Sequence, residues 1–123
     1  MSTIELQNLT KAFDKLIAVN NVSLKVDENE VLCLLGPSGC GKTTTLRMVA
    51  GLEVATSGDI LIGNNNVNNL ETRDRNLAMA FQFYALYPSL SVAENLANPL
   101  HAENLSDDEI KKKIFEVADI LQL

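Results

Sequence analysis

The sequence contains few of the residues that mark several well-defined classes of protein. It has no tryptophan, two cysteines and one histidine in 123 residues, and aromatic side chains make up 5% of it. Two cysteines are too few for a disulfide framework, so we expect Cys33 to be a small buried apolar residue and Cys40 to fill a loop. Both roles fit a reducing, cytosolic compartment. We expect the single histidine, His101, at the surface.

Basic residues and long apolar runs are also scarce. Ten Lys and Arg stand against 16 Asp and Glu, a net charge of −6, which argues against general nucleic-acid binding because that function needs a basic face. No apolar stretch reaches the roughly 20 residues that span a bilayer. Residues 1–5 show no basic segment followed by an apolar one, so no signal peptide is expected. The 46% share of hydrophobic residues instead predicts one globular domain at most.

One segment of the chain points to a ligand. Residues 36–43 read Gly-Pro-Ser-Gly-Cys-Gly-Lys-Thr, the complete G-x-x-x-x-G-K-T pattern of a phosphate-binding loop. An apolar run at 31–35 comes before the loop, and a helix-forming run at 44–50, closed by Gly51, comes after it. Strand, loop and helix in this order are the context that supports the motif.

The expected chemistry of the loop follows from its residue types. Glycines let successive backbone N–H groups turn inward as an anion-binding nest, and the helix N-terminus adds unpaired N–H groups and the positive end of its dipole. Lys42 is expected to reach the β- and γ-phosphates of a nucleotide, and the Thr43 hydroxyl to ligate Mg²⁺. The candidate nucleotide-binding residues of the loop are Gly36, Ser38, Gly39, Cys40, Gly41, Lys42, Thr43 and Thr44.

Hydrophobic patterning predicts the strands. We expect an edge strand at 4–9, a half-buried strand at 22–26, a strand buried on both faces at 31–35, a short strand at 60–62 and a second core strand at 77–81. Turns are expected at 27–30 and 57–59, a hairpin at 63–66, and a turn or short helix at 70–76.

Two helices are predicted in the second half of the chain. Capping boxes at Ser91 and Ser106 should open them, and Pro99 should stop the first. The second has one apolar face, with the lysines at 111–113 in solvent. That face is formed by Ile110, Ile114, Val117 and Leu121.

Two blocks of sequence resemble the ATP-binding subunit of an ABC transporter. The first runs from Leu35 through the loop to Ala50-Gly51-Leu52-Glu53 and on to 57–60, and the second, at 81–96, resembles the family's Q-loop and the start of its helical subdomain. The Tyr-Ala-Leu-Tyr-Pro form at 84–88 is similar to the ATPases of maltose-type and related sugar importers. The resemblance covers about residues 3–123. It implies an incomplete phosphate-loop α/β domain, with an N-terminal antiparallel β subdomain and ATP-binding core at about 1–88 and the start of the helical subdomain at about 89–123.

The resemblance also implies further residues of an ATP site. Phe13 would stack on adenine, a contact that suits a flat base and reads no hydrogen-bond pattern. Gln82 would contact Mg²⁺ and the attacking water. The expected catalytic residues are therefore Lys42 and Gln82, and the expected metal ligands are Thr43 and Gln82, with ATP and Mg²⁺ as the bound groups.

The partners implied by the resemblance are those of an importer. Residues 83–88, with Tyr84, Leu86 and Tyr87, would line a groove for a helix of the membrane-spanning permease subunits, although ordinary core packing remains an alternative for these side chains. Two ATP-binding subunits would sandwich two ATP molecules, peripherally attached to the cytoplasmic side of the membrane. An external solute-binding protein would be an indirect partner.

Several motifs of the family are not found in these 123 residues. There is no Leu-Ser-Gly-Gly-Gln signature, no apolar strand ending in Asp-Glu and no switch histidine. The chain is therefore interpreted as the N-terminal part of such an ATPase, whether a truncated product, a gene fragment or a piece of a longer polypeptide, and is expected to bind ATP with little turnover by itself. A strand at 32–35 without neighbours would favour instability or self-association.

Two other hypotheses about the function remain open. The chain could belong to another class of phosphate-loop enzyme, such as a kinase or GTPase, or it could be a non-catalytic ATP-binding or subunit-binding module.

Overall fold

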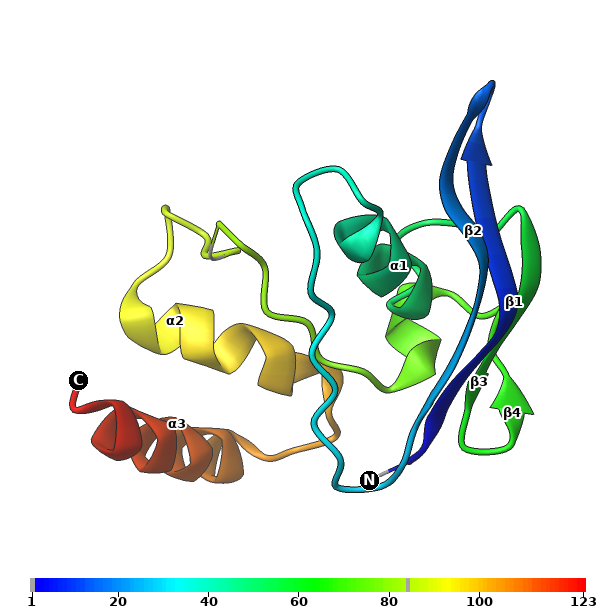
Figure 1. Ribbon diagram of the computed structural model, residues 1–123. Coiled ribbons are helices and arrows are strands. Elements are labelled where there is room, and N and C mark those ends of the chain that lie inside the picture. Colours follow the sequence, from blue (N-terminus) through cyan, green and yellow to red (C-terminus); the bar gives the residue numbers. More distant parts are fainter. Residues whose placement is uncertain (1, 84) are drawn as a thin grey trace. The chain divides into compact units, whose positions relative to one another are not determined.

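The computed structural model describes residues 2–83 and 85–123, which form two compact units. The first unit is Met1–Met79 and the second is Ala80–Leu123. Figure 1 shows that the first unit contains the sheet and helix α1, and that the second contains helices α2 and α3. In the described part of the chain, no helix combines the length and the apolar character needed to cross a bilayer.

The first unit is built on a four-stranded antiparallel sheet with the order β2-β1-β3-β4. Its strands are β1 (Ile4–Phe13), β2 (Leu16–Val26), β3 (Ser57–Ile62) and β4 (Asn65–Asn66). Helix α1 (Lys42–Val49) and the short 3-10 helix η1 (Thr72–Arg75) belong to the same unit. The hydrophobic core consists of Leu6, Leu9, Val19, Met48, Ile60 and Val67.

Several local predictions are confirmed in this unit. The alternating strand at 22–26 lies within β2, whose inward positions are partly buried. The turn at 27–30 is closed by a hydrogen bond from the Glu30 N–H to the Asp27 carbonyl (3.2 Å). The hairpin at 63–66 joins β3 to β4, with Gly63 at φ 61°, and the segment at 70–76 contains the 3-10 helix. These features depend on local turn chemistry, which the sequence displays directly.

Strand β1 lies inside the sheet, so the prediction of an edge strand at 4–9 is wrong. It pairs with β2 on one side and with β3 on the other. Asn8 adopts φ 51°, and the register shifts between Leu6 and Leu9. This bulge turns two leucines three positions apart to the same side, where Leu6 is 2% and Leu9 0% exposed. The alternation of apolar and polar residues is therefore interrupted by the bulge and not by the end of the strand.

The bulge also explains why residues 57–59 are not the predicted turn but the start of β3. Gly58 has φ 87°, and a Cβ at this position would overlap the carbonyl oxygen of Asn8. Glycine thus lets β3 approach the bulge of β1 closely. A Ser-Gly-Asp sequence that is typical of turns becomes strand because of this contact across the sheet.

The two predicted core strands are not strands in the structure. Residues 31–35 form no regular secondary structure, and Val31 is 88% and Leu35 90% exposed. Residues 77–81, which span the limit between the two units, are also irregular. A strand needs a neighbour for its N–H and C=O groups, and no strand of the described chain pairs with either segment. The predictions for 31–35 and 77–81 are therefore wrong for this structure.

Helix α1 ends at the residue predicted for it. The N–H of Gly51 donates to the Met48 carbonyl (3.1 Å), and the N–H of Leu52 donates to the Arg47 carbonyl (2.9 Å). These two bonds form a Schellman motif, with Gly51 in the left-handed region at φ 77°. A Cβ at Gly51 would lie 2.7 Å from Nε of Arg75, so the end of the helix leaves room for that guanidinium.

The guanidinium of Arg75 is buried and is satisfied by backbone carbonyls. Nη1 donates to Met48 (2.8 Å) and Val49 (3.0 Å) at the end of α1. Nε donates to Leu70 (3.1 Å) and Nη2 to Asn68 (3.4 Å). Burial lowers the pKa of the Arg75 guanidinium, but the cation faces the negative end of the helix dipole, which favours its charged form. Arg75 thereby joins α1 to residues 68–70.

The second unit confirms both predicted capping boxes. Helix α2 (Val92–Ala97) opens at Ser91 and α3 (Asp107–Leu121) opens at Ser106. The serine hydroxyl lowers the pKa of Glu94 in the first box and of Glu109 in the second by donating a hydrogen bond to the carboxylate. A 3-10 helix, η2 (Asn98–Ala102), contains Pro99 and follows directly after α2, as expected from the missing N–H of proline.

We expect the 123-residue chain to self-associate through residues 31–35. Replacing Val31 and Leu35 together, as Val31→Asp and Leu35→Lys, removes exposed apolar surface and should shift sedimentation from oligomer to monomer. Leu16→Lys is the matched control, because Leu16 is also exposed (67%) but lies in β2. A monomeric wild-type chain with a sharp two-state melt contradicts this prediction.

We expect Arg75→Met to lower the free energy of unfolding by about 2–4 kcal/mol, because four carbonyl groups lose their donor. Arg73→Met is the control: its side chain is 80% exposed beside Glu71, and its effect should stay within about 0.5 kcal/mol. Urea unfolding followed by circular dichroism measures both changes. Equal effects of the two variants would show that the buried contacts of Arg75 do not contribute to the free energy of unfolding.

Candidate functional site

The phosphate-loop sequence forms an exposed turn that leads directly into α1. Residues 38–41 are turn and bend, and α1 begins at Lys42. Gly41 stands at the N-cap with φ 93°, and a Cβ there would overlap the carbonyl oxygen of Ala18 in β2. The loop therefore lies against β2 by direct backbone approach, which only glycine permits.

The start of α1 is open to an anion. No side chain caps it, and no acidic residue lies in its first turn. Thr43 is exposed at the second helical position, while Thr45 is buried and its hydroxyl donates to the Gly41 carbonyl (3.0 Å). The unpaired N–H groups and the positive end of the helix dipole thus face outward beside the loop.

The ammonium of Lys42 folds back over the loop. Nζ donates to the carbonyl oxygens of Gly36 and Pro37, both at 2.7 Å, and lies 3.4 Å from Sγ of Cys40. Lys42 is thus on the loop side of the helix, where a phosphate chain would compete for the same three donors. Ser38, Gly39 and Cys40 are exposed on the loop.

A hollow of about 360 Å³ lies between β2 and the loop. Ile17, Ala18 and Val19 line it from the strand, and Cys40, Gly41 and Lys42 line it from the loop. One wall is apolar and the other carries the backbone and ammonium of the phosphate-binding sequence. This division suits a ligand with a flat or apolar part and an anionic part.

Phe13 ends β1 beside the turn to β2 and is 42% exposed. The ammonium of Lys11 lies over its ring, with Nζ 4.6 Å from the ring centroid. The ring is therefore presented to solvent on a strand next to the one that lines the hollow. Its role as the base-stacking aromatic stays a prediction.

The other predicted residues belong to the second unit. Gln82 is exposed in a turn, and its contact with Mg²⁺ and water stays a prediction. Of the predicted permease groove, Leu86 (69%) and Tyr87 (54%) are exposed, while Tyr84 lies outside the described residues. Core packing does not account for Leu86 or Tyr87, because both side chains face solvent.

Asn95, which the sequence did not single out, shapes the turn that carries Tyr87. Its Oδ1 accepts from the Tyr87 N–H (2.9 Å), and its Nδ2 donates to the carbonyls of Tyr87 and Leu90, both at 3.1 Å. A side-chain amide that closes a turn across eight positions has no local pattern to reveal it. Lys11 and Arg75 were missed as well, although the spacing of Lys11 and Phe13, two apart on a strand, does predict a shared face.

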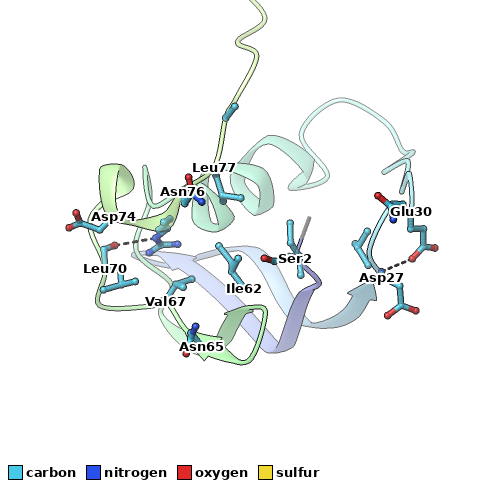
Figure 2. Close-up of a pocket in the computed structure, with 15 residues that line it drawn as sticks. Ser2, Asp27, Glu30, Ile62, Asn65, Val67, Leu70, Asp74, Asn76 and Leu77 are labelled. Atoms are coloured by element: carbon cyan, nitrogen blue, oxygen red, sulfur yellow. Dashed lines mark hydrogen bonds between the residues drawn. The ribbon is translucent and has the colours of Figure 1, made fainter. Parts of the chain in front are cut away.

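A second hollow, of about 550 Å³, lies elsewhere in the first unit and is lined by none of the loop residues. Figure 2 shows carboxylates of Asp27, Glu30 and Asp74 around it. Negative side chains repel a triphosphate, so the loop and not this hollow is the candidate nucleotide site.

The loop fits a magnesium nucleotide better than a free metal ion. No three His, Cys, Asp or Glu side chains gather into a metal site among residues 2–83 and 85–123. The predicted metal ligands, Thr43 and Gln82, offer oxygen atoms of the kind that a hard cation binds together with phosphate oxygens, and this role stays a prediction.

Comparison with known proteins identifies the family of the chain. The ABC transporter family profile matches residues 19–122. The sn-glycerol-3-phosphate import ATP-binding protein UgpC of Ruegeria pomeroyi is 50% identical over all 123 residues, which span 35% of that relative. The maltose/maltodextrin import ATP-binding protein MalK of Escherichia coli is 44% identical over the whole chain, which spans 33% of it. The chain thus spans about a third of these relatives.

Solved structures agree with this assignment. The dimeric structure of the bacterial ABC transporter cassette MJ0796 has a TM-score of 0.84 at 31% identity, over 98% of this chain and 57% of that one. The same cassette in a post-hydrolysis state bound to ADP and Pi has a TM-score of 0.82. The antiparallel sheet, the phosphate loop and the helices that follow are those of an ABC ATPase cassette, of which this sequence covers the N-terminal part. The chain belongs to the ABC transporter family.

Proposed function

We propose that the chain binds Mg-ATP as part of the energy-coupling ATPase subunit of an ABC importer for a sugar or related small solute. The observation that carries this proposal is the phosphate loop itself, which turns at Gly41 against β2 and opens into an uncapped α1. The relatives support the solute class, because their names give glycerol 3-phosphate, maltose and osmoprotective compounds as imported solutes.

In this proposal each part of the loop has one task. Backbone N–H groups of the loop and of the start of α1 would bind the phosphates, and Lys42 would exchange its bonds to the Gly36 and Pro37 carbonyls for bonds to phosphate oxygens. Thr43 holds Mg²⁺, and Phe13 stacks on the base. Gln82 would contact Mg²⁺ and the attacking water. Bound Mg²⁺ supplies charge neutralisation at the phosphates.

The proposed partners follow from the relatives and from the second unit. The dimeric cassette structures support a second ATP-binding subunit, and the exposed Leu86 and Tyr87 support permease contact through residues 83–88. An external solute-binding protein would act through the permease, and the subunit would lie on the cytoplasmic side of the membrane. The 123 residues alone are expected to bind ATP with little turnover, since no signature or Asp-Glu strand is among them.

The absence of tryptophan makes base stacking directly measurable. In a Phe13→Trp variant, ATP should quench the single tryptophan, whereas inorganic tripolyphosphate, which lacks a base, should not. Adding Lys42→Ala should weaken ATP binding by about 10- to 100-fold, the value of one or two charge-assisted hydrogen bonds. Lys25→Ala is the matched control, because Lys25 pairs with Asp27 outside the loop. Steady hydrolysis that Lys42→Ala abolishes would contradict low turnover, and unchanged ATP affinity in that variant would overturn the proposal.

Gly41→Ala should cost more than Gly39→Ala in both stability and ATP affinity. Both glycines have positive φ, so each substitution carries a backbone cost of about 1–2 kcal/mol. At Gly41 the new Cβ would also overlap the Ala18 carbonyl, whereas nothing lies within 4 Å of a Cβ at Gly39. Thermal melts and calorimetric titration with ATP compare the two variants. Equal losses would mean that the contact with β2 does not shape the loop.

A further inference from the structure

Lys11 makes three contacts through its side-chain ammonium. Its ammonium lies 4.6 Å from the centroid of the Phe13 ring, 2.7 Å from Oε1 of Glu53, and 2.7 Å from the carbonyl oxygen of Val54, to which it donates. The side chain is only 12% exposed, against 56% for Lys25 in its pair with Asp27. Lys11 is therefore held in place by largely buried contacts, whereas Lys25 makes an ion pair that is exposed to solvent.

The anchor of Lys11 is itself attached to β1. The Thr56 N–H donates to the Thr10 carbonyl (2.9 Å), and the Ala12 N–H donates to the Thr56 hydroxyl (3.0 Å). Residues 53–56 also follow α1 directly, across Gly51. These hydrogen bonds attach the segment that follows α1 to β1, the strand that carries the Phe13 ring.

A cation over one face of an aromatic ring has two consequences. It is attracted by the negative face of the ring and holds that ring in one orientation. It also covers this face, so that a planar ligand must use the opposite one. Lys11 cannot serve as a second phosphate ligand without giving up Glu53 and Val54, and the hydrogen bond from Lys11 keeps the pKa of the Glu53 carboxyl low, which keeps that carboxylate charged.

We propose that Lys11 is a positioning residue for the base: clamped by Glu53 and Val54, it covers one face of the Phe13 ring, fixes its orientation and leaves the opposite face for adenine. This inference rests on the proposed stacking of Phe13 on the base. In this arrangement the base stacks on one face of the Phe13 ring while the Lys11 cation lies over the other face. The contacts of Lys11 with Glu53 and Val54 connect the ring to the segment that follows α1.

The test separates base binding from phosphate binding. Calorimetry measures the affinities of the 123-residue chain for Mg-ATP and for inorganic tripolyphosphate. The readout is the affinity for Mg-ATP divided by the affinity for tripolyphosphate. Phe13→Leu should lower this ratio by about 10-fold through loss of stacking. Lys11→Met should lower it by about 3- to 10-fold, Lys11→Arg should restore most of it because the cation is kept, and the control Lys25→Met should leave it unchanged.

A double-mutant cycle shows whether Lys11 acts through the ring. If it does, Lys11→Met should change the ratio less than about 2-fold once Phe13→Leu is present. A purely structural role would weaken ATP and tripolyphosphate binding equally, leave the ratio unchanged and overturn the inference. If Phe13→Leu lowers the ratio and Lys11→Met does not, base stacking on Phe13 is supported and the proposed role of Lys11 is wrong. If Phe13→Leu has no effect on the ratio, base stacking itself is wrong, while Lys42→Ala still reports on the phosphate site.

Discussion

The guanidinium of Arg75 occupies the far end of the helix that begins at the phosphate loop. Its contacts with the last carbonyls of α1 place a cation where the helix dipole is negative, and its other bonds join the helix to residues 68–70. At the opposite end, Gly41 meets the backbone of β2. A helix attached at both ends keeps its first N–H groups in fixed directions, and an anion site built from backbone donors depends on such fixed directions.

The two halves of the candidate ATP site are built by different means. The phosphate half of the proposed site would use glycine backbone, a helix start and one ammonium, a set of groups that recognises charge and not the identity of the nucleoside. The base half of the proposed site would use the aromatic ring at the end of β1, with Lys11 over one face of that ring. The first half lies within one short stretch of chain, whereas the second brings together residues about forty positions apart in sequence.

The sequence was sufficient wherever the determinants are local. The turn into the helix at the loop, the helix end at Gly51 and the capping boxes at Ser91 and Ser106 each need only neighbouring residues, and all were predicted. Residues 31–35 have the composition of a buried strand but form none here, because a strand also requires a partner. The bulge at Asn8 and the burial of Arg75 depend on contacts across the sheet and between segments, for which hydrophobic periodicity carries no signal.

The closeness of Gly51 to Arg75 has a consequence for the evolution of the chain. Any side chain at position 51 would meet Nε of Arg75 at 2.7 Å, and the backbone there has φ 77°. A side chain at 51 would therefore push the guanidinium aside, and loss of Arg75 would remove a donor from four backbone carbonyls. Gly51 and Arg75 therefore stabilise the same end of α1, and selection for that helix end acts on both positions.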